Sequence, residues 1–206
     1  RVRLRDAGYT EVILLGHGLT GKELKNRLEG VDLVFHLAGV NRPENLLDFD
    51  SGNACFTKKL VEAMAQLSMF PRIAFASSTQ ATLENHYGRS KLFAEDTLQK
   101  YSEQYKTPLY LFRLTNVFGK WCQPNYNSVV ATFCHNIARN LPITVHDPSA
   151  SLSLVYIDDV MDAFIELLKD PDRESGFVMT DPIYETTVGE VVEILKSCHA
   201  SRNNLI

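Results

Sequence analysis

The sequence predicts an α/β protein with a doubly wound parallel sheet and a small C-terminal lobe. Apolar runs that resemble strands buried on both faces alternate with amphipathic helical segments along most of the chain. Such an alternation forms right-handed βαβ units, which build a parallel sheet. With 206 residues, 45% of them hydrophobic and 22% charged, the chain is long and apolar enough for this core. The predicted fold is therefore Rossmann-like.

The first half of the chain is expected to hold most of the sheet. Arg1 to Tyr9 is typical of the back half of an amphipathic helix that ends at a glycine, and chains seldom begin inside a helix. We therefore expect that a first strand and its glycine loop are missing from the N-terminus of this sequence. The predicted strands are 11–15, 31–39, 73–76 and 109–114. The predicted helices between them are 21–28, a stretch around 60–65, and 88–105.

The pattern loosens beyond residue 127, so we divide the chain into a core at 1–127, incomplete at its N-terminus, and a lobe at 128–206 interleaved with the last strands. Helices are predicted at 128–139 and 160–168, and strands at 143–145 and 152–157. Asp158 and Asp159 stand where the N-cap of a helix is expected, so we interpret them as structural. Thr187 and Glu190 have the spacing of a capping box, which predicts the start of a last helix.

Composition and charge exclude several classes of function. A formal charge of -4 and a pI near 5.9 argue against nucleic acid as a partner, because phosphate binding needs a concentrated basic face. The four cysteines and six histidines show no CxxC, HxH or HExxH spacing, so we expect no metal site. No signal peptide or long apolar span accompanies them, so we expect a cytoplasmic protein with reduced thiols and no membrane partner.

The segment from Tyr87 to Lys91 pairs a phenol with an ammonium at i and i+4, which places both side chains on one helix face. A nearby cation favours the phenolate, so Lys91 is expected to lower the pKa of Tyr87 from its reference of about 10. Ser77 and Ser78 directly follow the strand at 73–76 and add hydroxyls at a strand end. Together these residues indicate a proton-transfer site, although the tyrosine and lysine spacing alone also occurs in ordinary amphipathic helices.

A glycine motif earlier in the chain resembles a dinucleotide phosphate loop. Gly16, Gly18 and Gly21 match GxGxxG between a predicted strand and a predicted helix. We reject this interpretation, because an acidic ribose partner should follow about 20 residues later, where the segment 36–38 offers none. If 11–15 is instead the second strand, His17 lies where the adenosine ribose is bound, which favours NADPH over NADH. A plain loop residue is an equal alternative for His17.

Six motifs in order resemble the extended short-chain dehydrogenases/reductases, the NAD-dependent epimerase/dehydratase family, which acts on nucleotide sugars. They are the strand end at 35–39, Asn53, Ser77 with Ser78, Tyr87 with Lys91, and the segments 113–119 and 155–160. The segments 39–44, 118–128 and 131–134 are most similar to bacterial capsular-polysaccharide reductases. That branch implies NADPH-dependent reduction of the C4 ketone of a UDP-2-acetamido-2,6-dideoxy-hexulose, toward UDP-N-acetyl-L-fucosamine, with NAD(H) as the alternative cofactor. We also expect a homodimer and, in the full-length protein, a C-terminal cupin domain.

The resemblance implies a role for each candidate residue. Tyr87 would donate the proton, Ser78 would donate a hydrogen bond to the developing oxyanion, and Lys91 would support Tyr87 and bind the nicotinamide ribose. Residues 1–127 would bind the dinucleotide, and residues 128–206 the UDP-sugar. The cofactor-binding candidates are His17, Leu37, Ala38, Gly39, Ser77, Tyr87, Lys91, Leu114 and Asn116. The substrate-binding candidates are Asn116, Asn125, Asn127 and Ser128, although asparagines are also common in loops.

The sequence departs from the family pattern at several points. The family glycine loop is absent, so we expect this chain alone to bind dinucleotide weakly or not at all. Leu152 stands where many members place an arginine for the diphosphate. Thr79 and Gln80 stand where a dehydratase needs an Asp-Glu pair, which weakens that alternative. An epimerase on the same scaffold and a non-catalytic dinucleotide-sensing protein stay open.

Overall fold

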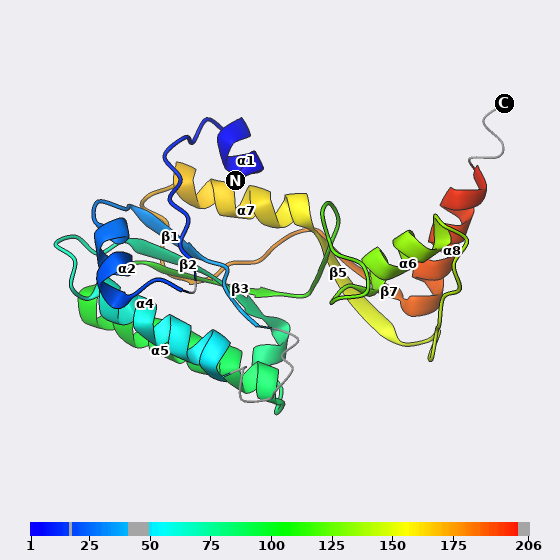
Figure 1. The fold of residues 1–206 in the computed structure, drawn as a ribbon, viewed down its shortest axis with the longest axis horizontal. Coiled ribbons are helices and arrows are strands. Elements are labelled where there is room, and N and C mark those ends of the chain that lie inside the picture. Colours follow the sequence, from blue (N-terminus) through cyan, green and yellow to red (C-terminus); the bar gives the residue numbers. More distant parts are fainter. Residues whose placement is uncertain (17, 41–49, 202–206) are drawn as a thin grey trace. The chain divides into compact units, whose positions relative to one another are not determined.

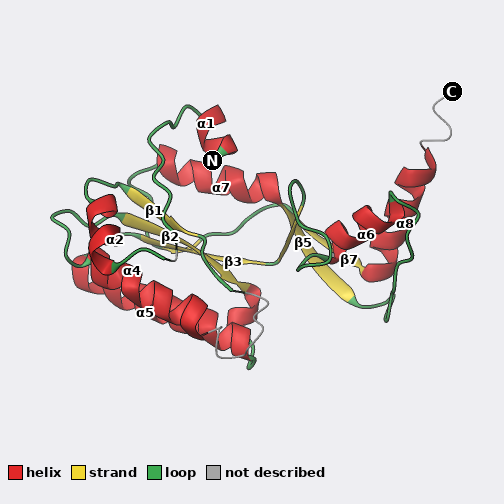
Figure 2. Cartoon of the chain, viewed as in Figure 1, coloured by secondary structure: helices red, strands yellow, loops and turns green. Residues whose placement is uncertain are grey.

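The computed structural model describes residues 1–16, 18–40 and 50–201, without the side chains of residues 50–52. The predictions for His17 and for the segment 41–44 therefore lie outside the described residues. The chain packs as two compact units, whose elements are shown in Figure 1 and Figure 2. Unit 1 comprises Arg1–Leu114 and Met161–Met179, and unit 2 comprises Thr115–Val160 and Thr180–Ile206. The binding of different ligands by residues 1–127 and 128–206 stays a prediction.

Unit 1 is built on a parallel sheet in the order β1-β2-β3-β6. Its strands are β1 (Leu33–His36), β2 (Arg72–Ser78), β3 (Leu109–Leu114) and β6 (Gly176–Phe177). The central strands β2 and β3 are mostly buried, because helices cover both faces of the sheet (Figure 1). In their register Ser77 lies opposite Arg113, and Ser78 opposite Leu114. This sheet confirms the predicted Rossmann-like α/β core.

The helices of unit 1 form a layer on each side of the sheet. On one side lie α2 (Gly21–Leu28), α4 (Phe56–Met64) and α5 (His86–Tyr105). On the other side lie α1 (Val2–Asp6) and the Met161–Lys169 part of α7 (Ile157–Lys169). Two short elements complete the unit: η1, a π-helix at Asp50–Cys55, and η2, a 3-10 helix at Thr79–Thr82.

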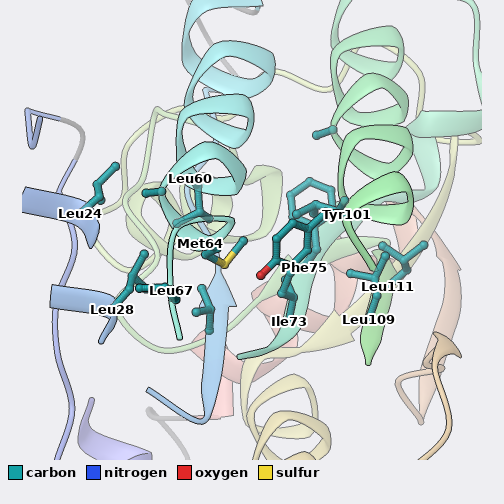
Figure 3. Packing of buried hydrophobic residues seen from close by; sticks show 14 residues of the cluster. Leu24, Leu28, Leu60, Met64, Leu67, Ile73, Phe75, Tyr101, Leu109 and Leu111 are labelled. Atoms are coloured by element: carbon teal, nitrogen blue, oxygen red, sulfur yellow. The ribbon is translucent and has the colours of Figure 1, made fainter. Parts of the chain in front are cut away.

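The main hydrophobic core fills the space between the sheet and the layer of α2, α4 and α5. Figure 3 shows how leucines and a methionine of α2 and α4 face aliphatic and aromatic side chains of the strands and of α5. Among the labelled residues are Leu24, Leu28, Leu60, Met64, Ile73, Phe75, Tyr101 and Leu109. On the other face Phe164 of α7 packs against Phe35 and Phe112, with ring centroids 5.4 and 4.6 Å away. The sheet is therefore anchored on both sides, which fixes the strand ends that carry the candidate site.

Unit 2 combines a small mixed sheet with two helices. The strand order is β4-β5-β7, in which β4 (Asn116–Phe118) runs parallel and β7 (Ile183–Thr187) antiparallel to β5 (Ser151–Tyr156). The helices α6 (Val129–Ile137) and α8 (Val188–Ser201) pack around Phe133 and Val192. The backbone N–H of Glu190 donates to Thr187 Oγ1 at 3.2 Å, and that of Thr187 to Glu190 Oε2 at 2.9 Å. This confirms the predicted capping box at the start of the last helix.

Two predicted strands are wrong. Residues 11–15 and 143–145 lie outside the sheets that the described residues form. An apolar run specifies an extended shape, but a strand also needs a hydrogen-bonding partner. Ile13 and Leu14 are each 53% exposed, whereas Ile143 and Val145 join the core of unit 2 as loop residues.

Three short strands and several helix boundaries also differ from the predictions. The strands β4, β6 and β7 were not predicted, because they are short and hold no continuous apolar run. The helix α7 begins at Ile157 rather than at Val160. Asp158 and Asp159 therefore lie in the first turn of α7 and not at its N-cap. Acidic side chains stabilise a helix there, because its N-terminus is the positive end of the helix dipole.

Candidate active site

The three predicted catalytic residues lie together at the carboxyl end of β2 and the start of α5. Ser78 is the last residue of β2 and is 9% exposed. Tyr87 is half-buried in the first turn of α5, where the Ser78 side chain is close enough to lower the pKa of its hydroxyl. Lys91, one turn later, is 4% exposed, and its Nζ donates to the backbone oxygen of Ala76 at 2.9 Å. The structure thus places a hydroxyl, a phenol and an amine at one strand end.

This arrangement depends on a close approach between α5 and η2. The side-chain oxygen of Asn85 caps α5 by accepting from the backbone N–H of Gly88 at 2.7 Å. A Cβ on Gly88 would lie 2.1 Å from the backbone oxygen of Gln80 and 2.7 Å from that of Leu83. Only glycine allows this contact, which brings the start of α5 to the segment that follows Ser78.

The electrostatics of the site correct one prediction. Burial raises the pKa of Tyr87, and the Ser78 side chain acts in the opposite direction. Lys91 was expected to lower this pKa, but its Nζ lies 5.9 Å from the centroid of the Tyr87 ring and is itself desolvated. Burial lowers the pKa of Lys91 to about 8, while the charge of Glu95 raises it. Tyr87 is therefore a protonated phenol near neutral pH, as a proton donor must be.

The loop after β1 lies beside Lys91. Its exposed residues Leu37 and Gly39 flank the half-buried Ala38. A Cβ on Gly39 would lie 3.0 Å from Lys91 Nζ and 3.1 Å from Asn53 Oδ1, so a larger residue would crowd the lysine. Backbone that is exposed at the end of a parallel strand, next to a buried amine, fits a dinucleotide such as NAD(P)(H).

The remaining cofactor candidates of unit 1 lie on neighbouring strand ends. Leu114 is the half-buried last residue of β3 and pairs with Ser78 in the strand register. Ser77 is buried, and its hydroxyl donates to the carboxylate of Glu95, so this side chain is hydrogen-bonded within the interior of unit 1. His17 lies outside the described residues.

The structure supports the rejection of the glycine motif as a dinucleotide phosphate loop. A Cβ on Gly21 would meet nothing within 4 Å, whereas the third glycine of a phosphate loop allows the helix to pack closely against the strand. The first turn of α2 is occupied by a capping box in which Glu23 accepts from the backbone N–H of Thr20 at 2.7 Å. A carboxylate therefore lies where a phosphate would have to bind.

The substrate candidates belong to unit 2, and several of them have local structural roles. The amide Nδ2 of Asn116, an exposed residue of β4, donates to the backbone oxygen of Ser153 at 3.2 Å. Asn125 has a left-handed φ of 57°, which asparagine tolerates, and Asn127 is exposed. Ser128 caps α6 by accepting from the backbone N–H of Ala131 at 3.2 Å. Their contact with substrate stays a prediction.

A hydrogen-bond network around Asn53, next to the candidate site, was not predicted from the sequence. The side chain of Asn53 is buried; its Oδ1 accepts from the backbone N–H of Val40 at 2.7 Å, and its Nδ2 donates to Ser90 Oγ at 2.9 Å. Ser90 Oγ in turn donates to the backbone oxygen of Tyr87 at 2.8 Å. Asn53 thus ties the loop after β1 to the first turn of α5. The family motif contained Asn53, but only the fold shows what it contacts.

Comparison with known proteins identifies the family. Residues 10–179 match the model of the NAD dependent epimerase/dehydratase family. The chain belongs to this family. A UDP-2-acetamido-2,6-beta-L-arabino-hexul-4-ose reductase of Pseudomonas aeruginosa is 42% identical over 202 residues, which cover 98% of this chain and 54% of that protein. The resemblance drawn from the six motifs is therefore confirmed.

Solved structures agree with this family. The capsular polysaccharide assembling protein CapF from Staphylococcus aureus has a TM-score of 0.77 at 38% identity, over 89% of this chain and 49% of that chain. A UDP-glucuronic acid 4-epimerase from Bacillus cereus in complex with NAD has a TM-score of 0.80 at 16% identity, over 96% and 69% of the two chains, which shows the fold alone. The chain spans about half the length of the curated relatives it matches.

Across the ranges that the structure describes, no group of three or more His, Cys, Asp or Glu side chains is arranged to hold a metal ion. No helix within those ranges is long and apolar enough to cross a membrane.

Proposed function

We propose that this chain is the reductase part of an enzyme that reduces the C4 ketone of a UDP-2-acetamido-2,6-dideoxy-hexulose with NADPH. The observation that carries the proposal is the cluster of Ser78, Tyr87 and Lys91 at one strand end, where the Ser78 side chain acts on the pKa of the Tyr87 hydroxyl. The 42% identical relative named as a UDP-hexulose reductase supports the substrate class. The product would serve the synthesis of UDP-N-acetyl-L-fucosamine for a capsule or O-antigen.

Each residue of the site would have its own role in the reduction of a carbonyl group. When bound, the reduced nicotinamide supplies the hydride. The Tyr87 hydroxyl donates a proton to the ketone oxygen, and the Ser78 hydroxyl stabilises the negative charge that develops there. The Lys91 ammonium stabilises the phenolate that Tyr87 becomes. Together these side chains would supply the proton and the charge stabilisation that the reduction of a ketone to an alcohol requires.

The chain also offers groups to hold the two ligands. Leu37, Ala38 and Gly39 present exposed backbone for the dinucleotide, and Lys91 would contact its ribose. Asn116, Asn125, Asn127 and Ser128 would bind the UDP-sugar through their amides and hydroxyl. His17 would favour NADPH over NADH, since it is not acidic.

The family resemblance further supports a cytoplasmic homodimer with a C-terminal cupin domain in the full-length protein. Light scattering of the full-length protein after size-exclusion chromatography measures its mass, and a monomer would contradict the homodimer.

The test is a reaction of the full-length protein with a UDP-4-keto-6-deoxy-HexNAc and either NADPH or NADH. We expect oxidation of NADPH in step with the appearance of a C4 hydroxyl in the sugar, followed by NMR, and slower oxidation of NADH. Isomerisation of a UDP-sugar without net consumption of dinucleotide would indicate an epimerase. Binding of NADPH without conversion of any sugar would indicate a sensing protein, and either outcome overturns the proposal.

A further inference from the structure

A buried carboxylate lies behind the candidate active site and has no part in the reaction proposed above. Glu95 is 4% exposed and follows Lys91 by one turn of α5. It accepts a hydrogen bond from the Ser77 hydroxyl, and from Arg113 through Nε at 3.0 Å and Nη2 at 2.6 Å. A buried charge is costly unless it is paired and its lone pairs are filled. These partners therefore hold the Glu95 side chain in one position.

The partners of Glu95 come from different elements that the sheet brings together. Ser77 of β2 lies opposite Arg113 of β3 in the strand register, so both side chains reach the same carboxylate. The guanidinium carbon of Arg113 also lies 4.6 Å from the centroid of the Phe177 ring of β6. Since Ser77 directly precedes Ser78, Glu95 links the strand end of Ser78 to the helix of Lys91.

Lys91 and Glu95 share one face of α5, because i and i+4 lie a single turn apart. Among the residues that the structure describes, the other groups near Lys91 include the Phe75 ring centroid at 5.0 Å, the Tyr87 ring centroid at 5.9 Å and the backbone oxygen of Ala76. Arg113 of β3 is a cation that faces Glu95. Among these groups Glu95 carries the negative charge, and this charge raises the pKa of Lys91 against the effect of burial.

We propose that Glu95 is a positioning residue of the reductase, whose carboxylate, fixed by Ser77 and Arg113, keeps the Lys91 ammonium charged next to Tyr87. This inference rests on the proposed function for its effect on turnover. Its effect on Lys91 itself does not depend on any activity. The neutral form of Lys91 cannot stabilise a phenolate, so loss of Glu95 would narrow the pH range in which the site works.

The first measurement follows the titration of Lys91 directly. The full-length protein is labelled with 13Cε-lysine, and the Lys91 signal is assigned by its absence from Lys91→Met. We expect the Lys91 midpoint to fall by about one pH unit in Glu95→Gln, because a nearby opposite charge shifts a pKa by about one to three units and Glu95 is also paired with Arg113. Glu95→Asp keeps the charge and should recover most of the shift. Glu103→Gln, at an exposed site on the same helix, should leave the Lys91 midpoint unchanged.

The second measurement is the pH profile of kcat/KM for the ketosugar. We expect its alkaline limb to move down by the same amount in Glu95→Gln and by less in Glu95→Asp. A Lys91 midpoint that stays in place in both variants overturns the inference, even if the variants are less stable. If Glu95→Gln does not fold, Glu95→Ala supplies the uncharged variant, and the same criterion applies to its Lys91 midpoint. Absence of turnover in the native protein contradicts the proposed function, while the NMR titration still decides the role of Glu95.

Discussion

Lys91 shows how burial changes the charge of a single side chain. It is 4% exposed, and burial lowers its pKa from 10.5 to about 8. Because the folded pKa is the lower one, the folded protein loses this proton first as the pH rises. Between about pH 8 and 10.5 the unfolded chain holds more protons than the folded one, so this group makes the protein more stable as the pH increases through that range. Below pH 8 the buried ammonium destabilises the fold.

Substitution of Lys91 by methionine tests this effect on stability. As the pH rises from 7 past 10.5, the free energy of unfolding of the native protein should increase by about 3 kcal/mol relative to that of Lys91→Met. Urea unfolding at a series of pH values measures it. The exposed Lys100→Met on the same helix serves as the control, and its difference from the native protein should stay constant. A constant difference for Lys91→Met as well would contradict the burial argument.

Ser78 can be separated from its neighbour Thr79 by a matched pair of variants. Ser78→Ala removes the hydroxyl proposed to stabilise the oxyanion, so kcat should fall by about 10²- to 10³-fold. It also removes the side-chain acceptor of the Gln80 N–H, at a cost in stability of about 1 kcal/mol. Thr79 is exposed, and Thr79→Ala should leave kcat unchanged. Steady-state kinetics decide the assignment, and a larger loss in Thr79→Ala would reverse it.

At the scale of elements, the contact between α5 and η2 sets the position of Tyr87. Gly88→Ala would place a methyl group 2.1 Å from the backbone oxygen of Gln80, so α5 must move or tilt. We expect a loss of about 1–3 kcal/mol in stability and a fall in kcat, because Tyr87 and Lys91 move with the helix. Gly21→Ala, where a Cβ meets nothing within 4 Å, is the control and should be neutral or slightly stabilising. Equal effects of the two substitutions in thermal unfolding would contradict this account.

The elements with strong local signals could be predicted from the sequence. The helix α2 spans Gly21–Leu28 as predicted, and the capping box of Thr20 and Glu23 marks its start. The strands β2 and β3 were found because they are continuous apolar runs buried on both faces. The failures at 11–15 and 143–145, and the short strands β6 and β7, have a common cause. Strand formation depends on a distant partner, which local pattern does not contain.

The same distinction applies to the candidate site. Ser78, Tyr87 and Lys91 could be predicted because their spacing encodes a strand end and one helix face. The contact of Ser77 with Glu95 and Arg113 could not, since it depends on the register of β2 against β3. A signal did exist: Glu95 falls on the buried face of α5 together with Ala94 and Leu98, where an unpaired acid would be costly.

At the scale of the whole molecule, the core of unit 1 supports the site and can be tested by truncation. Leu98 of α5 is fully buried between the helices and the sheet. Leu98→Ala should lower the free energy of unfolding by about 2–5 kcal/mol, because it removes buried methyl groups and leaves a cavity. Leu92→Ala on the same helix, at a site that is 40% exposed, should cost much less. Similar midpoints for the two variants in urea unfolding would contradict the packing described here.

Family membership and site chemistry together define the central claim for the molecule. The epimerase/dehydratase family spans different reactions, so the fold does not choose among them. The proposal of a reductase rests on Tyr87, the proposed proton donor beside Ser78, and on the relative named as a UDP-hexulose reductase. The proton donor is therefore the part of the account to test.

The most direct measurement is the rate of NADPH oxidation that a UDP-4-keto-6-deoxy-HexNAc elicits from the full-length native protein and from Tyr87→Phe. NADPH affinity is measured in parallel, and Tyr105→Phe at the far end of α5 serves as the control. We expect turnover by the native protein and by Tyr105→Phe, and a 10²- to 10⁴-fold loss in Tyr87→Phe with NADPH binding retained. Native-like turnover in Tyr87→Phe, or a native protein that binds NADPH and leaves the ketone intact, would contradict the account.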